Sequence, residues 1–396
     1  MARPDGAALE DGDVVAVALP PGPAWLGLVR EVWDAGAALL PVDHRLPVGE
    51  TRALLHRARP TMLVSSEGWG RRADGVPAEA DVALVVPTSG TGGEPKLVQF
   101  DRAAIDAAVA ASALALDATP HDRWLCCLPL AHVGGLLVLL RGVLLGAPVI
   151  VHPGFETKAV AAVRDVAFTS VVPTMLVRLL DAGVDLSGFR AILVGGAHLP
   201  LDVRDRARAS GAHLVETYGL TESCGGVVYE GLPLPGVQMR IDPEGGIELA
   251  GPMMMLGYRF DPESTARAFT PDGWLRPGDA GEIDLRGRLH VIGRADDLIN
   301  SGGEKVWPQE VETVLCTHPK VADVLVRGRL DPEWGQRVVA WVVAADPADP
   351  PTLEELRAHA TYRLPRHKAP REIVLVERLP RTAVGKPRTV GLPDRE

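Results

Sequence analysis

The densest group of potential phosphate ligands in the sequence is Thr88-Ser89-Gly90-Thr91-Gly92-Gly93-Glu94-Pro95-Lys96. It directly follows an apolar run at residues 82–86, which is typical of a buried strand. Three glycines let the backbone turn its N–H groups into one concavity, and three hydroxyls and a lysine add further phosphate contacts. The Gly-Lys-Ser/Thr ending of a Walker A loop is missing. A polar turn between strands would explain the glycines alone, so the whole set predicts a phosphate-binding loop.

Two further segments carry side chains suited to a nucleotide. In Glu216-Thr217-Tyr218-Gly219-Leu220-Thr221-Glu222, the tyrosine could stack on a purine, a threonine could contact a phosphate and Glu222 could hold Mg²⁺. In Trp274-Leu275-Arg276-Pro277-Gly278-Asp279, the final carboxylate could accept both ribose hydroxyls. Taken alone, the first segment is equally compatible with a strand-to-helix turn and the second with an Asx turn.

The last two segments that carry chemistry lie towards the C-terminus. One comprises residues 293–308 and contains Gly293-Arg294-Ala295-Asp296 and Ser301-Gly302-Gly303-Glu304-Lys305. The other is Arg381-Thr382-Ala383-Val384-Gly385-Lys386. Each could be a surface loop by itself. All five segments in this order and spacing are much less expected by chance than any one of them.

This ordered set resembles the adenylate-forming superfamily of acyl-CoA synthetases, peptide-synthetase adenylation domains and luciferases, over essentially the whole chain. The resemblance implies an enzyme that uses ATP, Mg²⁺ and CoA to activate a carboxylic acid as its acyl-adenylate and then to acylate a thiol. The implied phosphate contacts are Thr88, Ser89, Gly90, Thr91, Gly92, Gly93 and Lys96 at the β- and γ-phosphates, Thr221 at the α-phosphate and Glu222 at the magnesium ion. The implied nucleoside contacts are Gly195, Gly196, Ala197, Glu216, Thr217 and Tyr218, with Asp279 and Arg294 at the ribose.

The resemblance also implies two half-reactions and a moving domain. Lys386 would bridge the substrate carboxylate and the α-phosphate, so Lys386, Thr221 and Glu222 are the implied catalytic residues. The barrier to adenylation is largely repulsion between two anions, which Mg²⁺ and a lysine offset. Asp296 would be the hinge between a large domain, residues 1–295, and a small lid domain, residues 296–396. Rotation about it would bring in a tunnel for CoA lined by Ser301, Gly302, Gly303, Glu304 and Lys305.

The acid pocket is the least specific part of the pattern. Pro129-Leu130-Ala131-His132-Val133-Gly134-Gly135 resembles the family segment that borders the acid, which implies pocket roles for His132, Val133, Gly134, Gly219 and Leu220. A hydrogen-bonded core histidine is the alternative interpretation of His132. No aspartate stands in this segment to pair with an α-ammonium group, so an α-amino acid is disfavoured.

The acceptor and the acid follow from the compact form of the chain. The sequence ends shortly after Lys386, which favours a free thiol such as CoA over a fused carrier domain. A compact chain with these motifs is similar to o-succinylbenzoate–CoA ligases of menaquinone biosynthesis. An acyl- or aryl-CoA ligase of secondary metabolism, and an enzyme that loads a separate carrier protein, stay open. Gly92, where relatives commonly carry a hydroxyl, and Pro277, where many carry threonine, predict altered nucleotide affinity and retained activity.

Composition limits the partners and the location. The net charge is −10 with no basic run, which disfavours binding to nucleic acid or to an anionic membrane. The acidic N-terminus has no apolar export segment, so the cytoplasm is the expected location. The apolar residues 124–151 are interrupted by His132 and Arg141, which favours a buried strand-helix-strand unit over a membrane span. The four cysteines lack CxxC spacing and are expected to be reduced core thiols. A homodimer stays open.

The order of elements predicts an α/β fold. Short apolar runs at residues 38–41, 62–64, 82–86, 149–151 and 191–194 alternate with helical windows such as 48–58, 101–116 and 174–182. This alternation predicts a large N-terminal domain of parallel sheets covered by helices. Beyond Pro235, short runs broken by Gly, Pro and Asp predict a small antiparallel or barrel-like section. After Gly293, two helical windows and two long apolar runs predict a small, mobile α+β domain.

Overall fold

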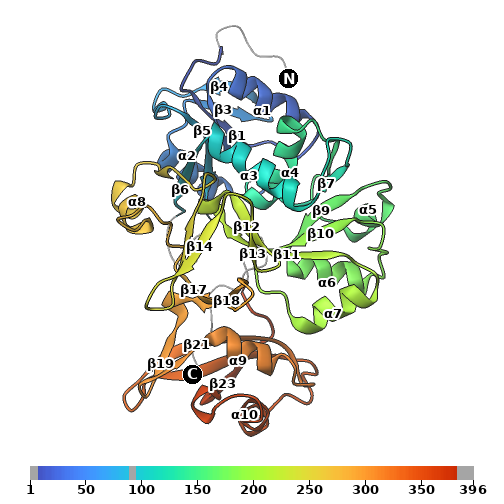
Figure 1. Cartoon of the computed structure of the whole chain (residues 1–396), viewed down its shortest axis with the longest axis vertical. Helices are drawn as coiled ribbons and strands as arrows, with labels where there is room; N and C mark the ends of the chain where they lie inside the picture. The colour runs from blue at the N-terminus through green and yellow to red at the C-terminus, as the bar shows by residue number, and fades with distance from the viewer. Residues whose placement is uncertain (1–7, 89–94, 381–396) are drawn as a thin grey trace. The chain divides into compact units, whose positions relative to one another are not determined.

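The structure is a computed structural model, and it describes residues 8–88 and 95–380 (Figure 1). Residues 1–7, 89–94 and 381–396 lie outside the described residues. The chain forms two compact units: the first contains the residues up to 239 and residues 249–275, and the second contains residues 240–248 and the chain from 276 onwards. Each unit has its own core.

The first sheet of the first unit has seven strands in the order β16-β6-β5-β2-β1-β3-β4. Its central strands are parallel, as expected, because β1 pairs with β2 and β3, and β2 pairs with β5. The edges are antiparallel, with β6 beside β5 and β4 beside β3. The two strands that flank the phosphate-loop segment in the sequence, β5 and β6, are therefore antiparallel partners. The strands are β1 (Val14–Val17), β2 (Ala38–Pro41), β3 (Met62–Ser65), β4 (Gly68–Arg71), β5 (Val82–Pro87), β6 (Leu97–Asp101) and β16 (Gly257–Tyr258).

Along the chain, the strands of this sheet are interspersed with helices α1 (Ala24–Asp34) and α2 (Val48–Ala58), and helix α3 (Arg102–Ala115) follows β6. All four residues of β1 are buried, as in a parallel strand covered on both faces. Helix α3 begins directly after β6, where the Asp101 carboxylate caps it by accepting a hydrogen bond from the Ala104 N–H at 2.7 Å. The chain therefore passes from β6 into a capped helix without a linker.

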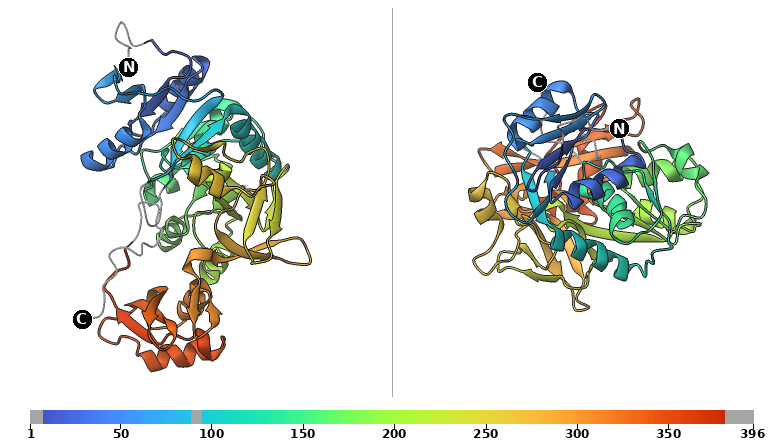
Figure 2. Two further views of the ribbon diagram at one scale, coloured as in Figure 1. Left: turned by 90° about the vertical axis from the view of Figure 1, so that its left-hand side faces the viewer. Right: turned by 90° about the horizontal axis from the view of Figure 1, so that it is seen from above.

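The second sheet has the order β13-β12-β11-β10-β9-β7-β8. Strands β8, β7, β9, β10 and β11 are parallel, and β12 is antiparallel to β11. Helices α5, α6 and α7 lie along it, in green in Figures 1 and 2. The strands are β7 (Trp124–Cys126), β8 (Val149–Val151), β9 (Phe168–Val171), β10 (Ala191–Val194), β11 (Leu214–Leu220), β12 (Gly225–Tyr229) and β13 (Leu232–Pro233). The helices are α4 (Val133–Leu144), α5 (Thr157–Ala162), α6 (Pro173–Asp181) and α7 (Leu201–Ala209), and α8 (Pro262–Ala268) follows β16.

The apolar stretch at residues 124–151 forms the predicted strand-helix-strand unit, β7-α4-β8. Arg141, which interrupts it, is buried over the Trp124 ring at 4.2 Å and donates to Ser112 Oγ at 2.6 Å. Among the described residues, every helix is too short or too polar to span a bilayer.

The second unit contains a five-stranded sheet in the order β20-β19-β22-β21, with β23 parallel to β22. Valines of β21 and β22 pack on Val311, Leu315 and Leu356 of the two helices, which gives this unit a separate core. The predicted antiparallel section consists of the pair β17–β18, within this unit, and the pair β14–β15, whose strands are each divided between the two units. The strands are β14 (Gln238–Ile241), β15 (Ile247–Ala250), β17 (Asp279–Ile283), β18 (Leu289–Arg294), β19 (Ile299–Ser301), β20 (Glu304–Val306), β21 (Val321–Asp331), β22 (Gly335–Ala344) and β23 (Glu372–Leu375). The α-helices are α9 (Pro308–Leu315) and α10 (Leu353–Thr361).

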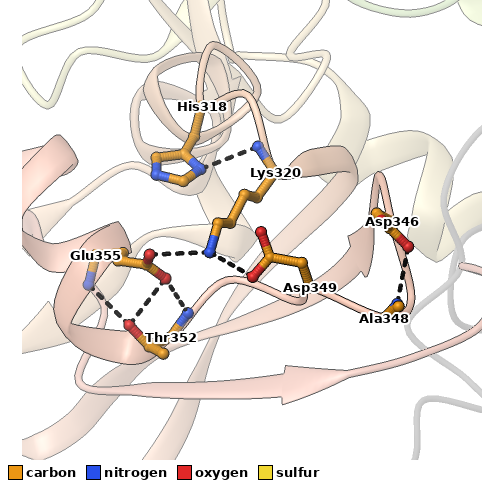
Figure 3. Close-up of polar contacts among 7 residues, drawn as sticks. All are labelled: His318, Lys320, Asp346, Ala348, Asp349, Thr352 and Glu355. Carbon is orange, nitrogen blue, oxygen red and sulfur yellow. Dashed lines mark hydrogen bonds and ion pairs between the residues drawn. The ribbon is translucent and has the colours of Figure 1, made fainter.

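A polar cluster fixes the start of α10 (Figure 3). Thr352 and Glu355 form a capping box, in which each side chain accepts from the other residue's backbone N–H. Lys320 Nζ bonds the same Glu355 at 3.0 Å and Asp349 at 2.8 Å. The chain just before β21 is thereby tied to the loop and the helix that follow β22.

The expectation of buried thiols is confirmed for Cys126, Cys127 and Cys224, and burial raises the pKa of the Cys127 thiol to about 11. It is wrong for Cys316, which is exposed. Cys316 follows the last residue of α9, where the helix has turned its apolar face to the sheet and leaves this position at the surface.

Candidate functional site

Two hydrogen bonds join Thr88 and Lys96, the residues at the two ends of the phosphate-loop segment. The Thr88 N–H donates to the Lys96 carbonyl at 2.8 Å, and the Lys96 N–H donates to Thr88 Oγ1 at 3.0 Å. These bonds continue the β5–β6 ladder and fix both ends of the loop. The predicted phosphate contacts Ser89, Gly90, Thr91, Gly92 and Gly93 lie outside the described residues, and so does Lys386. The roles of Thr88 and Lys96 at a phosphate stay predictions.

The segment at residues 216–220 is part of strand β11 and not a strand-to-helix turn. Glu216 pairs with the end of β10 and the following residues pair with β12, so the sheet overrides the turn-like composition. Thr217 Oγ1 donates to the Val194 carbonyl at 3.3 Å, at the end of β10. A Cβ at Gly195, the next residue, would lie 2.2 Å from Thr217 Oγ1. The two predicted adenine-binding segments therefore touch, and their contact requires glycine.

Glu216 has a structural partner that the sequence did not reveal. Its carboxylate accepts a hydrogen bond from Arg204 Nη1 of α7 at 3.1 Å, and its N–H donates to Glu230 Oε1 at 2.6 Å. The partners come from α7 and from the residue after β12, so only the pairing of β11 brings them together. A role for Glu216 at the nucleotide stays a prediction.

Glu222 lies in the short 3-10 turn η1 (Thr221–Ser223), directly after β11. Ser223 Oγ accepts from the Leu220 N–H at 3.0 Å and donates to the Gly225 carbonyl at 2.8 Å, which fixes the turn. Glu222 Oε1 accepts a hydrogen bond from the Tyr258 hydroxyl at 2.8 Å. The ammonium group of Lys96 lies 4.6 Å from the centroid of the Tyr258 ring.

Lys96 and Glu222, predicted from separate motifs, are therefore brought together through Tyr258, which sequence reasoning missed. The local signal, Gly257-Tyr258, is too short to mark a site, and its importance arises from the pairing of β16 with β6. Among the described residues, no cluster of three metal-binding side chains occurs. A single carboxylate fits Mg²⁺, which proteins commonly bind through one or two carboxylates together with substrate phosphates.

The predicted acid-pocket segment forms the start of α4. The His132 carbonyl accepts the N–H groups of Gly135 and Leu136, at 3.1 and 2.9 Å, so His132 is the N-cap residue. Helix α4 packs against β12, the strand that follows Glu222, so this segment belongs to the same unit as Gly219 and Leu220 at the end of β11. The pocket roles of Val133 and Gly134 also stay predictions.

A charged residue near His132 escaped the sequence analysis. Burial tends to raise the pKa of Asp43, but hydrogen bonds from Arg45 and a weaker attraction from His132 bring the pKa below its ordinary value. Arg45 Nε and Nη2 contact the two oxygens of this carboxylate at 2.9 and 2.7 Å. Asp43 therefore stays ionised, and its charge is matched by Arg45.

The second unit pairs the two predicted ribose residues. Asp279, at the start of β17, lies opposite Arg294, at the end of β18. Arg294 Nη1 contacts Asp279 Oδ1 at 3.2 Å and donates to the Pro277 carbonyl at 2.7 Å. The predicted hinge residue Asp296 follows in the exposed 3-10 turn η2 (Ala295–Asp297), whose Ala295 N–H bonds the Gly278 carbonyl at 2.8 Å.

The predicted CoA segment is the β19–β20 hairpin of the second unit. Its two central residues, Gly302 and Gly303, have φ angles of 65° and 86°, which a tight two-residue hairpin turn requires. The Gly302 N–H donates to the Trp334 carbonyl at 2.8 Å. Ser301 is buried, whereas Glu304 and Lys305 are exposed together with the two glycines. Lining of a CoA tunnel stays a prediction.

Comparison with known proteins gives one consistent result. Residues 65–259 match the AMP-binding enzyme family, and residues 310–386 match the AMP-binding enzyme C-terminal domain. A Mycobacterium tuberculosis protein named "Probable 2-succinylbenzoate--CoA ligase" is 40% identical over 372 residues, which cover 89% of this chain and 94% of the relative. The 2-succinylbenzoate–CoA ligase of Bacillus subtilis is 36% identical over 77% of this chain and 67% of its own length.

Solved structures agree with these relatives. The o-succinylbenzoate CoA synthetase of Bacillus subtilis, in complex with its acyl-adenylate intermediate, has a TM-score of 0.87 at 30% identity, covering 98% of this chain and 89% of that chain. The same enzyme with ATP and a magnesium ion has a TM-score of 0.86, covering 98% and 90%. ATP-bound MatB of Rhodopseudomonas palustris has a TM-score of 0.87 at 26% identity, covering 96% and 88%.

Proposed function

The chain belongs to the family of AMP-binding enzymes, and from this membership we propose that it is an ATP-dependent acid–thiol ligase whose acid is o-succinylbenzoate. The observation that carries the proposal is the 40% identity over 94% of a relative that bears this activity in its name. The products would be the CoA thioester, AMP and pyrophosphate. The thioester would then enter menaquinone biosynthesis.

In the first half-reaction, a substrate carboxylate oxygen attacks the α-phosphorus, and the bond to the β-phosphate oxygen breaks as pyrophosphate leaves. The attacking group is already ionised near neutral pH, so no general base is required. We assign Lys386 to the reacting carboxylate and α-phosphate, Thr221 to the α-phosphate, and Lys96 with the 88–96 loop to the leaving group. Bound Mg²⁺ would neutralise phosphate charge beside Glu222. Asp279 and Arg294 would hold the ribose.

In the second half-reaction, the CoA thiol attacks the acyl carbon and AMP leaves. We assign Asp296 as the hinge between a large domain, residues 1–295, and a lid, residues 296–396; this boundary lies C-terminal to residue 276, where the second compact unit resumes. We assign Ser301–Gly302–Gly303 with Glu304 and Lys305 as the CoA-facing segment. The exposed hairpin turn and its short β19–β20 ladder support this assignment. The cytoplasm is the proposed location, and a homodimer stays open.

The test is a pyrophosphate-release screen with purified protein, ATP, Mg²⁺ and CoA across o-succinylbenzoate, benzoates, fatty acids and alicyclic acids. We expect o-succinylbenzoate to give the highest kcat/KM, with AMP and an acyl-CoA as the other products. ADP formation would overturn the ligase assignment. Turnover of another acid with no response to o-succinylbenzoate would overturn the substrate, and transfer to a carrier protein without any CoA product would favour the carrier-loading alternative.

A further inference from the structure

Tyr258 contacts two residues of opposite charge, Lys96 and Glu222, which come from different motifs. It lies in β16, which pairs antiparallel with β6 so that Tyr258 faces Val98, two residues beyond Lys96. Its side chain is largely buried, with 8% of the residue exposed. Flanking backbone bonds fix the position, because the Leu256 N–H donates to the Gln99 carbonyl and the Arg259 N–H to the Leu97 carbonyl, at 2.9 and 2.8 Å. The ring therefore has little freedom to move.

The two ends of the Tyr258 side chain meet different partners. The hydroxyl donates to Glu222 Oε1 at 2.8 Å, and the ring face lies 4.6 Å from Lys96 Nζ. The backbone of the same segment holds Glu222 as well, since the Met255 N–H donates to the Glu222 carbonyl at 2.9 Å. One short segment, residues 255–258, thus holds both the backbone and the carboxylate of Glu222, and its Tyr258 ring also contacts Lys96.

An ammonium and a carboxylate this close to one aromatic ring would neutralise each other if they formed an ion pair. A phenol ring avoids this, because its face attracts a cation and its hydroxyl donates to an anion without adding net charge. Groups that hydrogen-bond a metal-binding carboxylate fix its orientation and tune the affinity for the metal. The contact with the ring is weak enough for the lysine to transfer to a phosphate.

We propose that Tyr258 is a positioning residue that aims the Glu222 carboxylate at magnesium and keeps the Lys96 ammonium apart from it, ready for the terminal phosphates of a Mg²⁺–nucleoside triphosphate. This inference rests on the proposed function. It predicts that Tyr258 affects the binding of a magnesium-bound triphosphate much more than the binding of AMP, which lacks the β- and γ-phosphates.

The test compares Tyr258→Phe, which keeps the ring and loses the hydroxyl, with Tyr258→Leu, which loses both contacts. Tyr362→Phe, at a residue that is 88% exposed, is the matched control. Calorimetry with the non-hydrolysable analogue α,β-methylene-ATP at a series of Mg²⁺ concentrations, and with AMP alone, requires no acid and no turnover. We expect Tyr258→Phe to raise the Mg²⁺ concentration for half-maximal analogue binding about tenfold. AMP affinity should be unchanged, and Tyr258→Leu should also weaken the analogue at saturating Mg²⁺.

A second measurement distinguishes an effect that acts through Glu222 from a general effect of the substitution on the fold. Glu222→Gln keeps an acceptor for the phenol but removes the charge, so Tyr258→Phe added to it should cause little further change in Mg²⁺ dependence. Equal loss of AMP and analogue binding in Tyr258→Phe, an unchanged Mg²⁺ dependence, or full additivity of the two substitutions would overturn the inference. Failure of the wild-type protein to activate any acid would instead refute the proposed function, because the binding measurements are independent of the acid.

Discussion

The contact between Gly195 and Thr217 allows a prediction to be worked from distances. In Gly195→Ala the new Cβ would lie 2.2 Å from Thr217 Oγ1 and 3.1 Å from the Thr217 carbonyl oxygen, whereas ordinary contact begins at 3.4 Å. The threonine side chain must turn away, which breaks its 3.3 Å hydrogen bond to the Val194 carbonyl. The methyl group would thus disturb both segments that are predicted to border adenine.

Overpacking of this kind costs about 1–3 kcal/mol. For a unit of this size, that loss corresponds to a fall in Tm of about 3–9 °C. The assay is thermal unfolding followed by near-UV circular dichroism, together with the Kd for AMP from calorimetry. We expect AMP binding to weaken in parallel, because the displaced threonine shifts the end of β10 against β11. Gly188→Ala is the matched control, since its Cβ would have no neighbour within 4 Å.

A second substitution tests whether the clash with Thr217 Oγ1 causes the loss of stability in Gly195→Ala. Thr217→Ala removes Oγ1 and leaves the Thr217 Cβ at 3.6 Å from the new methyl group, an ordinary contact distance. This single substitution should cost about 1 kcal/mol, the value of one hydrogen bond. The double variant Gly195→Ala/Thr217→Ala should then recover most of the loss, and any remaining difference from Thr217→Ala alone should reflect the 3.1 Å approach of the new methyl group to the Thr217 carbonyl oxygen. A double variant that melts as low as the sum of both single losses would refute the steric reasoning.

Three further predictions concern the lysine loop, the hinge and a buried acid. Lys386→Ala should suppress acid-dependent pyrophosphate release much more than thioester formation from supplied acyl-adenylate, because only adenylation requires its charge; equal losses in the two assays would contradict that role. Asp296→Pro should restrict η2 and slow thioester formation while adenylation persists, as a rapid-quench assay of the half-reactions would show, and unchanged turnover would exclude a hinge there. Burial raises the pKa of Glu312 from 4.5 to about 7, despite the hydrogen bond from the Val326 N–H and the nearby Arg327. The protonated side chain is therefore favoured in the folded state. The stability that it contributes is complete below pH 4.5 and is lost as the pH rises through 7. Glu312→Gln should therefore flatten the pH dependence of Tm of the second unit between pH 4.5 and 7, and parallel curves for the two proteins would argue against it.

Many elements could be predicted from the sequence because their signals are local. The bounds of α2, β2, β8 and β10 match the apolar runs and helical windows at residues 48–58, 38–41, 149–151 and 191–194. Their side chains recur with the period of a strand or a helix, and this period depends only on near neighbours. The glycine, hydroxyl and lysine content of residues 88–96 was likewise sufficient to predict a phosphate loop after β5, because backbone freedom and charge are properties of the residues themselves.

Strand partners and side-chain contacts were decided by the tertiary structure alone. The strand at residues 216–220, where the composition allowed a turn, is fixed by its pairing with β12, and the edge strand β6 pairs with β16, which is distant in sequence. Tyr258 bonds Glu222 across 36 residues and reaches Lys96 only because β16 pairs with β6. The energy of such contacts arises when separate segments are brought together, and no periodicity within either segment encodes it. The sequence therefore determined which residues can do the chemistry, and the sheet pairing determined which of them meet.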